Sequence, residues 1–122
     1  MNLLAHFYLS RATAPLLVGS FLGDFVKGKQ YQAFEPALAE GILLHREIDY
    51  FTDFHPTFLR SKHRLVAQHH HFAGVIVDIF YDHFLAKQWH NYSEVPLEDF
   101  TQEIYRTLFQ QQDLLPPKAQ QV

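Results

Sequence analysis

Cysteine is absent from this chain of 122 residues. Without a thiol the chain can form no disulfide, no thiolate metal site and no cysteine nucleophile, and this composition is typical of proteins in a reducing compartment. No basic region follows Met1, and His6 interrupts the first apolar stretch, so the N-terminus does not resemble a secretory signal peptide. We therefore expect a cytoplasmic protein.

Long uncharged apolar runs are also missing. Arg11, Asp24 and Lys27 interrupt the most apolar region, so we expect no membrane span, which needs roughly 18 or more such residues. The formal net charge of −3 argues against nucleic acid as a partner. The sequence contains no Gly-rich phosphate loop, no Gly-x-Ser-x-Gly elbow and no His-Glu-x-x-His helix, which argues against phosphate-loop enzymes, serine hydrolases and zincin proteases.

Glycine is scarce, with five residues, and the six prolines stand at positions typical of turns or first helical turns. Strict alternation of apolar and polar residues, which would indicate strands, does not occur. The sequence therefore predicts an all-α fold, a compact single domain over residues 1–122 built from about six helices. The expected helices span residues 2–10, 15–27, 36–54, 57–68, 72–89 and 97–111.

The expected helix 72–89 is apolar nearly all the way round, which predicts a central, buried helix. Asp78 and Asp82 lie one turn apart and therefore on the same face. Burying two unpaired carboxylates costs several kcal/mol each, at an order of magnitude, unless a metal ion, a basic side chain or a shared proton offsets the charge. The pair therefore indicates a functional site rather than two structural carboxylates.

The expected helix 36–54 carries a polar ridge at four-residue steps, formed by His45, Asp49 and Asp53. An imidazole one turn from a carboxylate suits a divalent metal, and the oxygen-rich surroundings favour Mn²⁺ or Mg²⁺ over zinc. A His–Asp pair at this spacing is also a common surface hydrogen bond. Taken alone, the ridge favours that structural interpretation.

Two further polar residues stand in apolar helices. Asp24 follows Gly23 and precedes Gly28, and these glycines would allow a ligand or metal to approach closely. Taken singly, Asp24 is typical of a solvated helix end and His6 of a buried structural histidine. Taken together, four helices each present a His or Asp on an apolar background, which predicts a metal site in the core of a helical bundle.

Four blocks of sequence resemble, in order and spacing, the acyl carrier protein phosphodiesterase family. They are NLLAHFYLS at 2–10, GSFLGDFVKG at 19–28, GILLHREIDYFTD at 41–53, and the helix with Asp78, Asp82 and His83. The resemblance implies an all-helical fold related to the HD-type metal phosphohydrolases, and manganese dependence. It also implies hydrolysis of the phosphodiester between phosphopantetheine and a serine of holo-acyl carrier protein. Family members usually continue past Pro117, so we expect this chain to lack a C-terminal helical segment.

The resemblance and the residue patterns together give a set of candidate site residues. The expected ligands of Mn²⁺, or of Mg²⁺ or another divalent ion in its place, are His6, Asp24, His45, Asp49, Asp78 and Asp82. Asp24 matches the family's essential aspartate, and we expect it also to orient or deprotonate the attacking water. Lys27 and Arg46, each near motif residues, are expected to balance phosphate charge.

Two alternative functions remain open at this stage: a related phosphohydrolase acting on a nucleotide, and a non-catalytic helical protein that binds haem or a structural metal. A basic cluster on the fourth helix predicts a contact with the acidic carrier protein; it comprises Arg60, Lys62, His63 and Arg64. An apolar stripe on the last helix predicts a homodimer formed through the C-terminal helices; it comprises Phe100, Ile104, Leu108 and Phe109.

Overall fold

The structure of the protein is a computed structural model that describes residues 2–117. Within this part of the chain there are six α-helices and no strands, which confirms the all-α prediction. The α-helices are α1 (Leu3–Leu9), α2 (Ala14–Leu22), α3 (Pro36–Asp53), α4 (Pro56–His69), α5 (Ala73–Lys87) and α6 (Leu97–Gln110). The 3₁₀ helices are η1 (Gly28–Ala33), η2 (His70–Phe72), η3 (Trp89–Asn91) and η4 (Gln112–Leu114).

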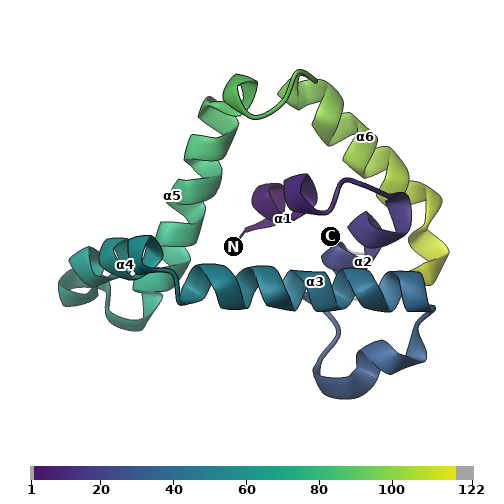
Figure 1. Cartoon of the computed structure of the whole chain (residues 1–122), viewed down its shortest axis with the longest axis horizontal. Helices are drawn as coiled ribbons and strands as arrows, with labels where there is room; N and C mark the ends of the chain where they lie inside the picture. The colour runs from purple at the N-terminus through teal and green to yellow at the C-terminus, as the bar shows by residue number, and fades with distance from the viewer. Residues whose placement is uncertain (1, 118–122) are drawn as a thin grey trace.

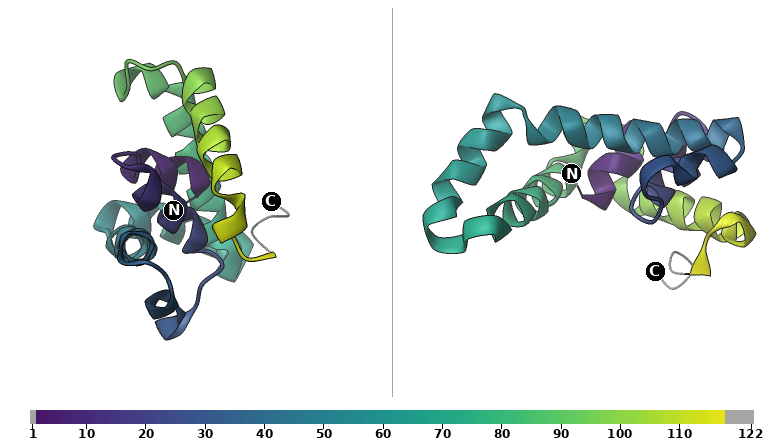
Figure 2. Two further views of the ribbon diagram at one scale, coloured as in Figure 1. Left: turned by 90° about the vertical axis from the view of Figure 1, so that its right-hand side faces the viewer. Right: turned by 90° about the horizontal axis from the view of Figure 1, so that it is seen from below.

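Helices α3, α5 and α6 form a frame around the two short N-terminal helices (Figure 1). α3 runs along the base, α5 rises beside α4, and α6 returns on the other side toward the far end of α3. α4 and its turn into α5 lie at one end of the long axis, away from α2 and η1 (Figures 1 and 2). None of the described helices is both long and apolar enough to cross a membrane.

The starts of α2, α3 and α4 follow from local sequence. α2, α3 and α4 begin with proline at their first or second position. Proline lacks the backbone N–H, but an N–H at these positions would have no hydrogen-bond acceptor within the helix. The Thr13 side chain also accepts a hydrogen bond from the Leu16 amide, which caps α2. The expectation that this helix runs to residue 27 is wrong, since α2 ends at Leu22. The chain turns at Gly23 so that Val26 can enter the core.

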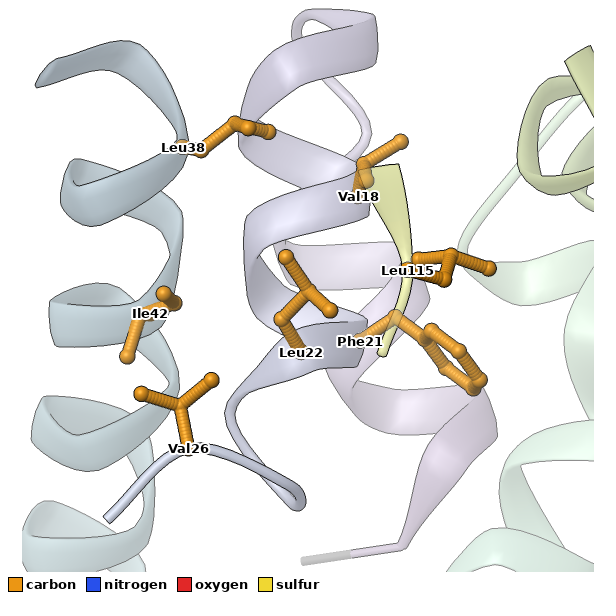
Figure 3. Packing of buried hydrophobic residues seen from close by; sticks show 7 residues of the cluster. All are labelled: Val18, Phe21, Leu22, Val26, Leu38, Ile42 and Leu115. Carbon is orange, nitrogen blue, oxygen red and sulfur yellow. The ribbon is translucent and has the colours of Figure 1, made fainter. Parts of the chain in front are cut away.

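The main core lies between α2 and α3, which approach with their backbones in contact. A methyl group added at Gly19 would lie 2.3 Å from the Leu38 carbonyl oxygen, and one at Gly41 would lie 2.5 Å from that of Leu16. This proximity lets a dense apolar cluster form, shown in Figure 3: Val18, Phe21, Leu22, Val26, Leu38, Ile42 and Leu115. Burial of each large side chain contributes roughly 1.5–3 kcal/mol, so this cluster holds α3 firmly against α2.

A second cluster attaches α6 to α2. Phe100 and Ile104 are buried against Leu17 and Trp89, whose indole N–H donates to the Val95 carbonyl oxygen at 2.7 Å. Of the apolar stripe predicted to form a dimer contact, Phe100 and Ile104 are therefore buried within the chain itself and not free to contact a second copy. The large exposed aromatic side chains of α6 are Tyr105 and Phe109, which are 73% and 71% exposed.

The prediction that the fifth helix is central and buried is also wrong. On α5 only Ala73 and Val77 are buried, whereas Ile79, Phe80 and Phe84 are about half exposed. The reason is its place in the frame, because α5 packs mainly against α4 and the short helix α1, which leave much of its surface uncovered. The described part of the chain therefore does not surround α5, although the helix is apolar on nearly every face.

Candidate metal centre

The imidazole rings of His6 and His45 stack on each other where α1 meets α3. Their centroids are 3.8 Å apart and their planes differ by 8°. Both residues are buried, at 2% and 4% exposure. The Nδ1 atoms of both rings are buried without a hydrogen-bond partner in the described structure. Stacking and the contacts of Nε2 therefore fix the orientation of each ring.

The Asp49 carboxylate links the two rings. Its Oδ1 lies 2.8 Å from His6 Nε2 and its Oδ2 lies 3.2 Å from His45 Nε2. Burial raises the pKa of Asp49, but the hydrogen bonds from His45 and His6 outweigh burial and hold this pKa well below its usual range. Asp49 is therefore ionised, and the imidazole Nε2–H groups donate to it.

Asp24 approaches the same cluster from the turn after α2. Its Oδ1 is 3.3 Å from His45 Nε2, and its side chain is 53% exposed. The hydrogen bond with His45 lowers the pKa of Asp24, against the opposing effect of burial. Burial lowers the pKa of the His45 imidazole, but the hydrogen bonds to Asp24 and Asp49 outweigh it and raise that pKa to about 9. This part of the site is therefore an ionic cluster with one cation between two anions.

Three of these side chains have the arrangement of metal ligands. One ligand atom from each of His6, His45 and Asp49 lies within 4.8 Å of the other two. Two imidazole nitrogens and a carboxylate oxygen are donors that first-row divalent metals accept. The Nε2–H groups of both rings point to Asp49, so a metal bound by these nitrogens would displace both protons. The donor set therefore fits a divalent metal.

A cavity of about 260 Å³ opens beside the cluster. It is lined by Gly23, Asp24, Val26, Lys27, Gly28, His45, Arg46 and Asp49. The Arg46 guanidinium donates to the Val26 carbonyl oxygen at 3.2 Å and lies over the Tyr31 ring. Both cations predicted to balance phosphate charge, Lys27 and Arg46, thus share this cavity with the acidic side chains.

The structure places Asp78 and Asp82 beside this cluster rather than in it. Both line a neighbouring cavity of about 220 Å³ that also contacts Asn2. The Asp82 carboxylate accepts hydrogen bonds from the backbone amides of Leu4 and Ala5 at 2.9 and 3.1 Å, so it is directed at the start of α1. Burial raises the pKa of Asp78, and the carboxylates of Asp53 and Asp49 on α3 raise it further.

Two features of the site were not predicted from the sequence. The stack of His6 on His45 brings together residues 39 positions apart, and Asp82 bonds an amide 78 positions away. The spacing of residues in the sequence predicts neither contact, because each depends on where the rest of the fold places α1. The one local signal is Gly23 before Asp24, which leaves room for the His45 ring: a methyl group there would lie 2.4 Å from its Cγ.

Comparison with known proteins relates this chain to one family. Three proteins named acyl carrier protein phosphodiesterase are similar to the chain. That of Serratia proteamaculans (strain 568) is 33% identical over 98% of the chain, that of Enterobacter sp. (strain 638) 37% over 82%, and that of Escherichia coli O45:K1 (strain S88 / ExPEC) 35% over 83%.

The matched regions cover 63%, 52% and 53% of those relatives, so the chain spans between half and two thirds of their length. No solved structure matches the chain significantly. The profile of the family described as acyl carrier protein phosphodiesterase matches residues 1–122, the whole chain. Together with the relatives, this match shows that the chain belongs to the acyl carrier protein phosphodiesterase family.

Proposed function

We propose that this chain is a metal-dependent phosphodiesterase that removes the 4′-phosphopantetheine arm from holo-acyl carrier protein. Water would add to phosphorus, the bond from phosphorus to the serine oxygen would break, and the serine would leave as a hydroxyl of apo-acyl carrier protein. The observation that carries the proposal is the cluster of His6, His45 and Asp49, with Asp24 beside it, in a chain of this family.

His6, His45 and Asp49 would hold the metal, and Mn²⁺ is the ion that the family resemblance implies. When bound, such an ion polarises a phosphoryl oxygen and lowers the pKa of a bound water toward neutrality. Before binding, Asp49 and Asp24 hold His45 in place through hydrogen bonds to its Nε2. Two of the donors come from one rigid helix, α3, so their spacing is set before any ion arrives.

We propose Asp24 as the residue that orients the attacking water. It is the most exposed member of the cluster, and its lowered pKa keeps it ionised at neutral pH, ready to accept a hydrogen bond from water. Lys27 and Arg46 line the same cavity, so either could face the non-bridging phosphate oxygens. Arg46 is anchored by the Val26 carbonyl oxygen, which limits its movement.

The carrier protein is acidic, and α4 offers a complementary surface. This helix contains no Asp or Glu, and it carries the basic cluster Arg60, Lys62, His63 and Arg64 as well as His69 at its end. Arg60, His63 and Arg64 are exposed. A surface of this charge would attract an acidic partner and raise the association rate at low ionic strength. We propose α4 as the docking helix for the carrier protein.

We also propose that the chain forms a homodimer through its C-terminal helices. With Phe100 and Ile104 buried, the side chains available for this contact are Tyr105 and Phe109, both more than 70% exposed. Exposed aromatic side chains of this size promote association when they gather on one surface.

The decisive assay follows the mass of holo-acyl carrier protein incubated with this chain and Mn²⁺. The expected result is loss of the phosphopantetheine group, abolished by a chelator and reduced about 100-fold or more by Asp24→Asn. Asp99→Asn, an equivalent change at an exposed position on α6, should leave the rate unchanged. Hydrolysis of nucleotides instead of holo-acyl carrier protein would contradict the proposed substrate, and metal binding without any hydrolysis would contradict an enzymatic role.

A further inference from the structure

Asp82 joins two helices through both of its carboxylate oxygens. From α5, Oδ2 accepts from the Leu4 amide at 2.9 Å and Oδ1 accepts from the Ala5 amide at 3.1 Å. The bonds are partly buried, and hydrogen bonds to a charged acceptor are stronger than those between neutral groups. This contact is therefore a strong link between the start of α1 and the middle of α5.

α1 depends on such a link. It has seven residues, and a helix this short is unstable in water by itself. Its N-cap residue, Asn2, makes no side-chain hydrogen bond to the helix, so the first turn lacks a local cap. Asp82 supplies from another helix the acceptors that the N-cap lacks, and its negative charge is also favourable at a helix N-terminus.

The position of α1 decides where the His6 ring lies. His6 directly follows Ala5, the second residue that Asp82 holds. Its ring is 2% exposed and its Nδ1 has no hydrogen-bond partner in the described structure, so no bond on that side of the ring fixes its orientation. A shift of α1 would therefore move His6 Nε2 relative to Asp49 and the His45 ring.

We infer that Asp82 is a positioning residue that sets the His6 imidazole against His45 and Asp49 by fastening α1 to α5. This inference rests on the proposed function in one respect, namely that His6 is one of the metal ligands. It assigns to Asp82 a role that acts through the backbone of α1 rather than through direct contact with metal or substrate.

The test uses two readouts on Asp82→Ala and the milder Asp82→Asn. One is the proton NMR signal of the His6 ring in metal-free protein, assigned by its loss in His6→Gln. This signal reports the 3.8 Å stack on His45 through ring-current shifts. The other is the Mn²⁺ dissociation constant measured by calorimetry. Both variants should move the His6 signal, and Asp82→Ala should weaken Mn²⁺ binding about 10-fold, the effect typical of losing a contact that orients a metal ligand.

Two controls separate positioning from helix capping. Asp99→Asn removes a carboxylate from the first turn of α6 and should change neither readout. Asn2→Asp, added to Asp82→Ala, offers α1 a local cap without joining it to α5, so it should raise the melting temperature without restoring the His6 signal or Mn²⁺ affinity.

An unchanged His6 signal and unchanged Mn²⁺ affinity in either folded Asp82 variant would overturn the inference. Full recovery of both readouts by Asn2→Asp would also overturn it, because Asp82 would then act only as a cap. If the unaltered chain binds no Mn²⁺, the metal site of the proposed function fails, and the His6 signal still decides the role of Asp82.

Discussion

The substitution Gly23→Ala should disrupt the site by steric contact alone. Gly23 has helical backbone angles, φ −54° and ψ −30°, which alanine adopts without strain. An added Cβ, however, would lie 2.4 Å from Cγ and 2.8 Å from Cδ2 of the His45 ring. Carbon atoms in favourable contact are about 3.5–4.0 Å apart, so the ring would have to move by about 1 Å.

The His45 ring has little freedom to make that movement. It is buried, stacks on His6, and makes hydrogen bonds with Asp24 and Asp49. Overpacking of this kind costs about 1–3 kcal/mol. Metal ligands must also lie within about 0.2 Å of their ideal distances, so a displacement of this size should weaken Mn²⁺ binding at least about 10-fold.

Gly74→Ala is the matched control, because it makes the same chemical change in an uncrowded part of a helix. The nearest atom to its added Cβ is Lys62 Cε at 3.8 Å, and alanine favours the helix by up to about 1 kcal/mol. Thermal melts and Mn²⁺ calorimetry on both variants give the answer. Gly23→Ala should be destabilised and bind Mn²⁺ weakly, whereas Gly74→Ala should be at least as stable as the parent. Unchanged Mn²⁺ affinity in Gly23→Ala would refute the proposed role of His45 as a ligand.

Three further predictions concern pH, charge and association. The pKa of His45 rises from about 6.5 unfolded to about 9 in the fold, so its contribution to stability, at most about 3 kcal/mol, is complete below pH 6.5 and lost as the pH rises through 9; melts of metal-free protein should show this fall, and an equal fall in His45→Gln would contradict it. Arg60→Glu with Arg64→Glu should weaken capture of the acidic carrier protein, most strongly at low salt, and a salt-independent loss would count against docking on α4. Tyr105→Ser with Phe109→Ser should shift sedimentation toward the monomer, and a parent chain that is already monomeric would exclude the proposed dimer.

The helices were predictable because their signals are local. The prolines at the start of α2, α3 and α4 each act within one helical turn. The scarcity of glycine leaves few residues that would interrupt a helix. The end of α2 was not predictable from such signals, since the chain leaves the helix at Gly23 to bury Val26 against residues of α3. That choice depends on packing between segments distant in sequence.

The same limit applies to the site. The four-residue spacing of His45 and Asp49 predicted that they share a face of α3, and the structure brings both to the cluster. The equal spacing of Asp78 and Asp82 predicted a shared face just as well, but periodicity does not reveal what lies opposite that face. The hydrogen-bond partners of Asp82 are backbone amides of α1, and the pattern of residue types does not reveal backbone partners.

The most direct test of the metal centre is anomalous X-ray diffraction from crystals of this chain grown with Mn²⁺. The account predicts one strong manganese peak at ligand distance, about 2.0–2.6 Å, from His6 Nε2, His45 Nε2 and an Asp49 carboxylate oxygen, with Asp24 beside it. A peak on Asp78 and Asp82 instead, or no ordered manganese near the two stacked imidazoles, would contradict it.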